Sequence, residues 1–308
     1  MPGQWYGLKS GEWRSPGRIS IDAQDPPVDN DYGEIGARPA VLTPPSGSDT
    51  GPRSATMQTL TGAQAMTTIK AATPELDGKK YLRRTLITST LDLSTTGADA
   101  LVFEDCVLDA GQSTWYGVLS NVAPTGPWVE FRHCELTGGS AATLRGGYMR
   151  ILRCDVHHGG DLVKPYYGME IWASWLHDNY RDVDAHCDTI QIVAGCDGLL
   201  IHYNTLSGFV SADSPNEPSG YCSGVLQTGP VSATVGPVAW TGNWISGGRY
   251  AIRGSSAQGN GYSVTQIFRD NRFTPGSFQY GPTAFIAPGS EDFDASNVWD
   301  DTGLPVEV

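Results

Sequence analysis

The sequence predicts an all-β solenoid, and three observations support this fold class. The first is composition, because the 308 residues include 38 glycines and 20 prolines while only 17% are charged. This composition is typical of a turn-rich β protein and excludes a coiled coil. The second observation is a short pattern that recurs along most of the chain. The third is a second short strand that aligns between successive copies of the pattern.

The recurring pattern consists of an apolar residue, two variable residues, a small residue, one variable residue and another apolar residue, followed by a polar or glycine-rich turn. It is clear in Phe103-Glu-Asp-Cys106-Val-Leu108 and in Ile201-His-Tyr-Asn204-Thr-Leu206. Leu86-Ile-Thr-Ser89-Thr-Leu91 is a candidate earlier copy. The small positions are Cys106, Cys134, Cys154, Ser174, Asn204, Asn243 and Asn271, and the turns begin at Asp109, Thr137, His157, His177, Ser207, Ser246 and Thr274.

Successive small positions are 20 to 39 residues apart, and the spacing of 20 occurs twice. A shortest spacing of one coil length, exceeded by different amounts in other coils, indicates a solenoid with loops inserted into some coils. We therefore expect Cys106, Cys134 and Cys154 to stack inward on successive coils, where their parallel Cβ directions disfavour disulfides. The chain has no CxxC motif, so a structural zinc site is not expected. Pairing of Cys196 with Cys222, both in predicted loops, stays open.

A second strand aligns between the copies of the pattern. Its last aligned position reads Ser120, Arg145, Lys164, Gln191, Gln227, Arg253 and Ala287. In parallel stacked strands such positions lie about 4.8 Å apart. The alignment therefore predicts a column of hydrogen-bond donors along one face of the solenoid.

The remaining segments flank the solenoid, which we expect over residues 85–308. Residues 1–55 contain eight of the 20 prolines and are expected to be extended, as an attachment segment. Within that segment, Trp5, Tyr6 and Trp13 suggest docking on a partner. Residues 56–84 include a predicted short helix and are expected to cap the open apolar end of the solenoid. The acidic stretch from Glu291 either covers the other end or is loosely held.

Small or asparagine side chains stacked at a turn resemble the right-handed parallel β-helix proteins, which include pectate-lyase-like enzymes and β-helical tail proteins of bacteriophages. The resemblance covers about residues 85–290. His186-Cys-Asp188-Thr-Ile-Gln191 is also similar to a His-x-Asp-x-Ile-Gln segment of β-helix proteins from actinobacteria and their phages. The resemblance implies a right-handed parallel β-helix, and fold alone does not specify function.

Net charge and segment composition narrow the function classes. A formal charge of −13 argues against general nucleic-acid binding, because it repels phosphate. No apolar run is long enough to span a bilayer, and the first residues lack the features of a secretory signal. We therefore expect a protein of the virion tail or, alternatively, an extracellular protein whose signal was removed.

The donor column is the first candidate site. Arg145, Lys164, Gln191 and Gln227, continued by Arg253, suit an extended hydroxyl-rich or acidic chain such as a host-surface polysaccharide. The alternative is that these residues merely occupy exposed strand positions. His186 and Asp188 lie two residues apart in an extended stretch and so project to one side, where a carboxylate could orient an imidazole for acid–base catalysis. A hydrogen-bonded turn that supports the glutamines is the alternative.

Two further chemical hypotheses involve the same region. For a polysaccharide lyase, Lys164 would be the base and Arg145 the group that neutralises a substrate carboxylate and depresses the lysine pKa. The paired aspartates and Arg-Ile-Lys segment of β-helical polygalacturonases are absent, which lowers the hydrolase interpretation. No cofactor is expected. Ca²⁺ is the metal that the carboxylates would favour, and Asp161, Asp184, His186 and Asp188 are the candidate ligands, with His157, His158 and His177 nearby in sequence.

Trp172, Trp175 and Trp244 occupy outward positions of the repeat. Trp172 and Trp175 could stack on sugar rings, but an outward tryptophan stripe more often indicates a subunit interface. We expect a homo-oligomer, a trimer by analogy with tail proteins. The leading functional hypothesis is a bacteriophage minor tail or tail-tip protein that binds a host-surface glycan and contacts other tail proteins through residues 1–55. Depolymerase activity on that glycan is a further hypothesis. The alternatives are a secreted lyase of pectate-lyase-like fold and a structural solenoid.

Overall fold

The structure is a computed structural model that describes residues 44–54, 57–95, 99–120, 128–166, 168–183, 185–193, 196, 198–229, 235–254, 264–286 and 291–307. Trp5, Tyr6, Trp13, Asp184 and Ala287 lie outside these ranges. Residues 44–308 form one compact unit. In the described part of the chain, no helix is long and apolar enough to cross a membrane.

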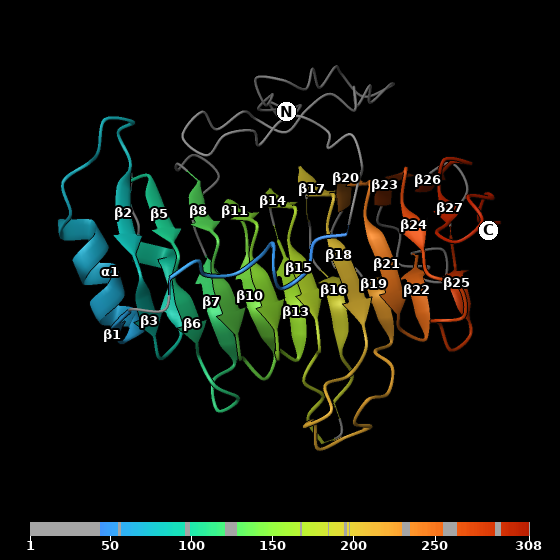
Figure 1. Ribbon diagram of the computed structural model, residues 1–308, viewed down its shortest axis with the longest axis horizontal. Helices are drawn as coiled ribbons and strands as arrows, with labels where there is room; N and C mark the ends of the chain where they lie inside the picture. Colours follow the sequence, from blue (N-terminus) through green and yellow to red (C-terminus); the bar gives the residue numbers. More distant parts are fainter. Residues whose placement is uncertain are drawn as a thin grey trace. The chain divides into compact units, whose positions relative to one another are not determined.

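The described residues form a parallel β-helix, as the sequence predicts. Its strands belong to three parallel sheets of ten, nine and eight strands, and each coil visits the nine-stranded, the ten-stranded and then the eight-stranded sheet (Figure 1). The ten-stranded sheet consists of β1 (Gln58–Leu60), β3 (Thr85–Ile87), β6 (Val107–Asp109), β9 (Glu135–Thr137), β12 (Asp155–His157), β15 (Trp175–His177), β18 (Thr205–Gly208), β21 (Trp244–Gly247), β24 (Arg272–Phe273) and β27 (Val298–Trp299).

The other two sheets complete each coil. The nine-stranded sheet consists of β2 (Lys80–Arg83), β5 (Leu101–Glu104), β8 (Val129–Arg132), β11 (Met149–Leu152), β14 (Met169–Trp172), β17 (Leu199–His202), β20 (Val235–Thr241), β23 (Val264–Arg269) and β26 (Glu291–Phe293). The eight-stranded sheet consists of β4 (Leu91–Asp92), β7 (Tyr116–Ser120), β10 (Ala142–Gly146), β13 (Asp161–Pro165), β16 (Asp188–Ile192), β19 (Gly224–Thr228), β22 (Tyr250–Arg253) and β25 (Gly281–Ala284). A short 3₁₀ helix, η2 (Leu93–Thr95), follows β4.

A single left-handed residue turns the chain from the nine-stranded to the ten-stranded sheet in most coils. Asp105, for example, has φ +52°, and Tyr203 has φ +55°. The small residue of the repeat follows this turn and stacks in register on the next coil, as predicted. Cys106, Cys134 and Cys154 are at most 2% exposed and face the core. The prediction that these three cysteines stack inward is confirmed.

The stack of small residues continues as an asparagine ladder. Oδ1 of Asn243 accepts the backbone N–H of Asn204 at 3.0 Å, and Oδ1 of Asn271 accepts that of Asn243 at 3.0 Å. Asn297 extends the ladder by one coil. At the N-terminal end of the stack of small residues, Leu86 lies opposite Val107, which puts Thr85 opposite Cys106. The earlier copy of the repeat is therefore Leu82–Ile87, and its assignment to Leu86–Leu91 was wrong.

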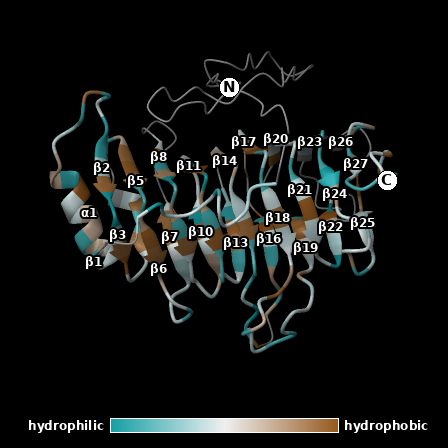
Figure 2. Cartoon of the chain, in the orientation of Figure 1, coloured by the Kyte–Doolittle hydropathy of each residue, from teal (hydrophilic) through white to brown (hydrophobic). Residues whose placement is uncertain are grey.

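Aromatic residues stack inside the solenoid beside this ladder. The rings of Phe103 and Phe131 are 5.1 Å apart and nearly parallel, and those of Trp240 and Phe268 are 6.1 Å apart. These side chains are at most 1% exposed. Figure 2 shows that the most apolar residues lie mainly on the strands, which also carry hydrophilic residues. Burial of this continuous apolar column is the main stabilising contribution to the fold.

The helix α1 (Gly62–Ala71) lies at the N-terminal end of the solenoid, beside β1, β2 and β3 (Figure 1). Thr61 and Gln64 form a capping box that satisfies backbone N–H groups at its start. Ala65, Met66 and Ile69 are buried in the core. At the other end, β26 and β27 pair with β23 and β24, so that the chain after Glu291 forms a further coil.

Residues 44–54 run across several coils in the direction opposite to the chain's progress along the solenoid (Figure 1). The carbonyl of Pro45 accepts a hydrogen bond from Oγ1 of Thr205 at 2.7 Å. Near the other end of the segment, Nε of Arg53 donates to Oδ1 of Asp105 at 2.8 Å. This segment therefore links coils that are far apart in sequence.

Candidate functional site

The eight-stranded sheet brings the predicted donor residues into one column. Arg145 pairs with Lys164, Gln191 pairs with Gln227, and Gln227 pairs with Arg253. Lys164 lies opposite Gln191 because Val163 pairs with Ile190. Five predicted members therefore occupy consecutive coils.

Both ends of the predicted column need correction. Arg145 pairs with Leu119, while Ser120 pairs with Gly146. On the coil before Arg145 the column position is therefore Leu119 instead of Ser120, and Leu119 pairs in turn with Asp92 of β4. At the other end, Arg253 pairs with Ala284, and Ala287 lies outside the described residues.

Among the predicted donors, Arg145 is held by two tyrosines. Its Nη2 donates to the hydroxyl of Tyr166 at 2.8 Å, and its guanidinium lies 4.6 Å from the ring centre of Tyr116. Lys164 forms an ion pair with Asp161, with 2.8 Å between Nζ and Oδ2. A catalytic base needs a free lone pair on its nitrogen, whereas the Lys164 ammonium is held by the carboxylate of Asp161. The contacts of Lys164 therefore give no support to its predicted role as a base.

A buried pair of aspartates, Asp161 and Asp188, contacts the residues of the column. Oδ1 of Asp161 accepts the backbone N–H of Asp188 at 2.7 Å, and Oδ1 of Asp188 accepts that of Gly224 at 2.7 Å. The second oxygen of each carboxylate faces a column residue, since Oδ2 of Asp188 accepts a hydrogen bond from Gln191 at 3.2 Å. The same arrangement thus repeats on two coils.

Burial raises the pKa of both carboxyl groups. For Asp161, Lys164 opposes the effect of burial without cancelling it. For Asp188, the negative charge of Asp161 adds to burial and raises the pKa well above the usual range. Asp188 is fully buried, so a second negative charge beside Asp161 is unfavourable. The pair is suited to hold a proton at pH values where an exposed aspartate would have lost it.

A groove of about 610 Å³ lies over the later part of the column. His186 and Asp188 line it, together with Gln191, Gln227 and Arg253. The side chain of His186 is 64% exposed, and its Nε2 lies 3.1 Å from Nε2 of Gln191 and 4.0 Å from Asp188.

The far end of the groove combines a cation with an aromatic ring. Nη1 of Arg253 donates to Oε1 of Gln227 at 3.2 Å, and its guanidinium lies 5.5 Å from the ring centre of Phe285. Phe285 also lines the groove and is 46% exposed. The groove therefore presents planar amides, a cation, an imidazole and one aromatic ring from consecutive coils.

The two tryptophans proposed to bind substrate lie on other sheets. Trp172 ends β14 of the nine-stranded sheet, is 8% exposed and stacks on His202 at 4.5 Å. Trp175 begins β15 of the ten-stranded sheet and stacks on His177 at 3.5 Å. Trp244 shares the column of Trp175 and is 7% exposed. The three rings do not form one exposed stripe, contrary to expectation.

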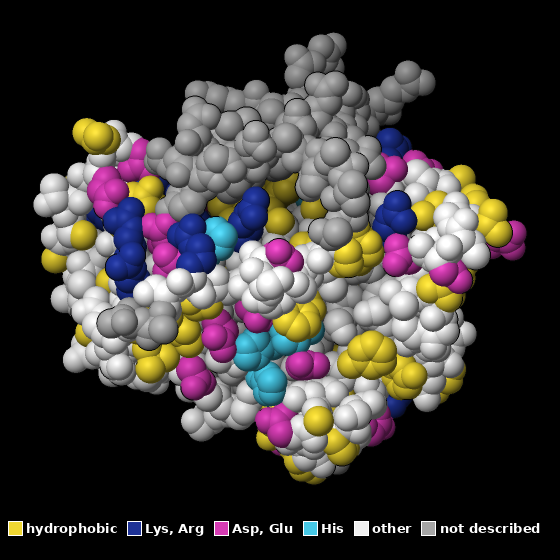
Figure 3. Space-filling model, viewed as in Figure 1, with side chains coloured by type: hydrophobic (Ala, Val, Ile, Leu, Met, Phe, Trp, Pro, Cys, Tyr) yellow, Lys and Arg dark blue, Asp and Glu magenta, His cyan; other side chains and the backbone are white. Residues whose placement is uncertain are grey.

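A cluster of histidines on the ten-stranded sheet was not recognised as a unit from the sequence (Figure 3). His157 pairs in register with His177, and their rings are 5.3 Å apart. His177 lies between two carboxylates, at 2.8 Å from Asp155 and 2.9 Å from Asp178. Burial lowers the pKa of His177, but the hydrogen bonds to these carboxylates outweigh burial and raise it.

The cluster extends to a neighbouring loop through His158. Nδ1 of His158 lies 2.7 Å from Nδ1 of His157, and its Nε2 lies 3.0 Å from Oγ of Ser211. The repeat contained a signal for part of this cluster, because His157 and His177 occupy the same turn position 20 residues apart. The contact with Ser211 depends on a loop that folds back, which the repeat does not reveal.

The candidate metal ligands fall into two separate groups. His157 and His177 lie on the ten-stranded sheet, whereas Asp161 and Asp188 lie on the eight-stranded sheet. Among the residues that the structure describes, no group of three or more His, Cys, Asp and Glu side chains is arranged to hold a metal ion.

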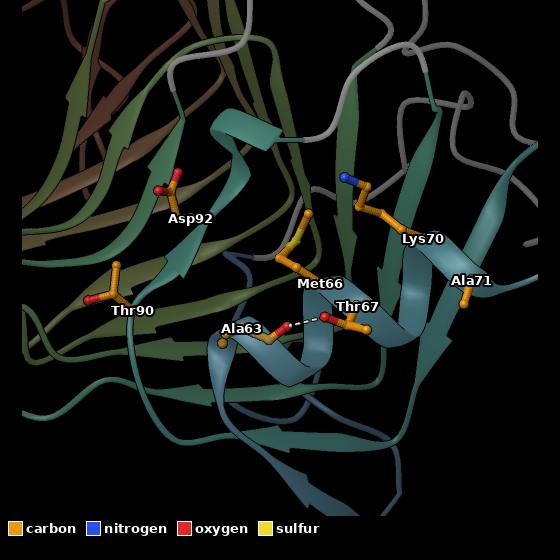
Figure 4. A pocket seen from close by; sticks show the side chains of 8 residues that line it. Ala63, Met66, Thr67, Lys70, Ala71, Thr90 and Asp92 are labelled. Carbon is orange, nitrogen blue, oxygen red and sulfur yellow. Dashed lines mark hydrogen bonds between the residues drawn. The ribbon is translucent and has the colours of Figure 1, made fainter.

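A second pocket, of about 660 Å³, lies between α1 and β4. Figure 4 shows its lining side chains, which include Met66 and Lys70 of the helix and Asp92 of β4. Oγ1 of Thr67 is bonded to the carbonyl of Ala63 within the helix. No residue of the predicted site lines this pocket, which is a feature of the solenoid end.

Comparison with known proteins adds no functional assignment, since no family model, no curated protein and no solved structure matches this chain.

Proposed function

We propose that this protein is a glycan-binding β-helix and that the groove lined by His186, Gln191, Gln227, Arg253 and Phe285 is its binding site. The observation that carries the proposal is the register of Gln191, Gln227 and Arg253 on three consecutive coils beneath an open groove. Repeated donors and acceptors at a strand spacing of about 4.8 Å suit a ligand that is itself extended and repetitive.

The chemistry of the groove supports a hydroxyl-rich ligand. Amide side chains both donate and accept hydrogen bonds, so Gln191 and Gln227 match the hydroxyl groups of a sugar. The exposed ring of Phe285 offers an apolar face on which a sugar ring can stack. Arg253 provides a cation for an acidic sugar, and Arg145 and Lys164 continue the positive side chains along the column.

An array of bacterial surface polysaccharides and their oligosaccharides tests the proposal. Wild-type protein should bind at least one glycan, and Gln227→Ala and Arg253→Ala should each weaken that binding by about 10-fold or more, as expected for loss of a hydrogen bond to a polar or charged group. Arg272→Ala is the matched control, because Arg272 is an ion-paired arginine on the ten-stranded sheet. Equal weakening by Arg272→Ala, or no binding to any glycan, would overturn the proposal.

Cleavage of the bound glycan is a second proposal, which one observation favours. Asp188, a buried carboxyl group with a raised pKa, and the exposed imidazole of His186 both line the groove, and this supports a role for them as acid and base. This arrangement supports acid–base catalysis more than a lyase mechanism with Lys164 as base. Asp188→Asn should abolish product formation and retain glycan binding. If the protein only binds the glycan, neither the wild type nor Asp188→Asn forms a product.

We also propose that the protein acts in a bacteriophage tail, attached through residues 1–55, with an extracellular enzyme as the alternative location. The resemblance of the repeat to β-helical tail proteins supports this assignment. Immunogold labelling of purified phage particles should decorate the tail tip. Light scattering tests the proposed homo-oligomer, for which a trimer gives three times the mass of the chain and a monomer contradicts it.

A further inference from the structure

Two buried cysteines meet at the edge of the groove. Cys187 directly precedes Asp188 at the start of β16, and Cys222 directly precedes Ser223, which lines the groove. Their sulfur atoms are 2.9 Å apart, and the two residues are at most 1% exposed. This contact differs from the pairing of Cys196 with Cys222 that the sequence left open.

The backbone around these cysteines is fixed by hydrogen bonds. The N–H of Ser223 donates to the carbonyl of Cys187 at 2.9 Å, and the N–H of Cys222 donates to that of Gly208 at 2.9 Å. Cys222 is therefore a diagonal neighbour of Cys187 and does not lie opposite it in the column. A diagonal arrangement allows the two Cβ atoms to point toward each other, which a disulfide requires.

The cysteines of the stacked column are arranged differently. The thiols of Cys106, Cys134 and Cys154 each donate to backbone carbonyls, for example from Cys134 to Phe103 at 3.4 Å. Their Cβ atoms project in parallel because the three residues occupy equivalent positions on successive coils. The Cys187–Cys222 pair is therefore the pair best placed for a cross-link among those that the structure describes.

We propose that Cys187 and Cys222 are a site of oxidative modification, where a disulfide joins the start of β16 to the end of the loop that precedes β19. A small-molecule disulfide such as oxidised glutathione is the oxidant. One protein thiolate attacks it and releases the first glutathione thiol, and the second protein thiolate then displaces the other. Two protein thiols lose two protons and two electrons, and one glutathione disulfide becomes two thiols.

The position of the pair determines when the reaction occurs and what it does. Burial disfavours the thiolate form of Cys222, whose pKa is raised, so exchange requires opening of the loop at residues 209–222. Such a disulfide persists in an oxidising environment outside the cytoplasm. Because Asp188 and Ser223 directly follow the two cysteines and line the groove, the cross-link would fix their separation. This inference does not depend on the ligand of the groove.

Thiol counting and peptide mapping test the inference on the full chain. After incubation with oxidised glutathione and denaturation without reductant, four of the six cysteines should react with a maleimide, and one peptide pair linked through Cys187 and Cys222 should be found. Cys187→Ser and Cys222→Ser should each lack this cross-link and carry at most one glutathione, as a mixed disulfide on the remaining cysteine of the pair. Six reactive thiols in oxidised wild-type protein, or a cross-link between other cysteines, would overturn the inference.

Cys154→Ser is the matched control, because Ser174 occupies the same column position on the next coil and accepts the backbone N–H of Cys154 at 3.0 Å. This variant should retain the Cys187–Cys222 link and show three reactive thiols. The oxidised wild-type protein should melt roughly 5–10 °C above its reduced form, since the link closes a long loop. Cys187→Ser should show no such shift with oxidant. An equal rise of the melting temperature in oxidised Cys187→Ser would show that another reaction causes the stabilisation.

Discussion

Removal of one asparagine side chain from the ladder should strongly destabilise the solenoid. Asn243 is fully buried. Its Oδ1 accepts the backbone N–H of Asn204, and its Nδ2 donates to the carbonyl of Ile201 at 2.9 Å. Asn243→Ala leaves both backbone groups buried without these partners. Each such group costs about 1–3 kcal/mol, so the free energy of unfolding should fall by about 2–6 kcal/mol.

Asn243→Ser provides an intermediate case. A serine oxygen can accept the N–H of Asn204, as Ser174 accepts that of Cys154, but it does not replace the bond to Ile201. The serine variant should therefore lose about half as much stability as the alanine variant. Asn216→Ala is the control, because the Asn216 amide makes an exposed bond of 3.5 Å to Asp182, and its effect should stay within about 0.5 kcal/mol.

Equilibrium urea denaturation followed by circular dichroism measures these differences, provided that the variants share one m-value. The reasoning is refuted if Asn243→Ala unfolds within about 1 kcal/mol of the wild type, or if the serine variant is less stable than the alanine variant.

Three further perturbations test other parts of the structure. The raised pKa of His177 implies a stabilising contribution that is fully present below the unfolded pKa of about 6.5 and is lost as pH rises through the folded pKa. The melting temperature of wild type relative to that of His177→Gln should therefore fall from pH 5 to pH 9. A difference that stays constant with pH would contradict this. Gly139→Ala should destabilise the protein in thermal unfolding, because φ is +91° and the new Cβ would lie 2.2 Å from the carbonyl oxygen of Ala142, whereas Gly281→Ala, with open space around it, should have little effect. Arg53→Ala removes the ion pair with Asp105 and should speed hydrogen exchange at the amide of Gly51, which is bonded to Arg153; unchanged exchange would show that this segment is held by other contacts.

The core columns could be predicted from the sequence because burial restricts the side chains that can stack there. The small positions from Cys106 to Asn271 are regular enough to set the register of the solenoid. The error at Ser120 arose where two apolar residues, Val118 and Leu119, are adjacent, since either could face the core. A slip of one residue moves every side chain of a strand to the other face.

Contacts made by loops could not be predicted from the repeat. The repeat correctly predicted that Trp172 and Trp244 lie outside the solenoid core. It did not predict that both are buried, because this burial depends on neighbours that no local pattern reveals. The contact between Cys187 and Cys222 likewise joins residues on two sides of an inserted loop. Such pairings depend on the path of an insertion, which periodicity does not determine.

Hydroxyl-radical footprinting with the strongest glycan from the array tests the proposed groove most directly. Bound glycan should protect Phe285 and His186, which line the groove and are well exposed without ligand. Trp115 and Tyr280, which are 72% and 63% exposed and do not line it, should be oxidised at unchanged rates. Protection of Trp115 or Tyr280 with no protection of Phe285 and His186 would show that the glycan binds elsewhere.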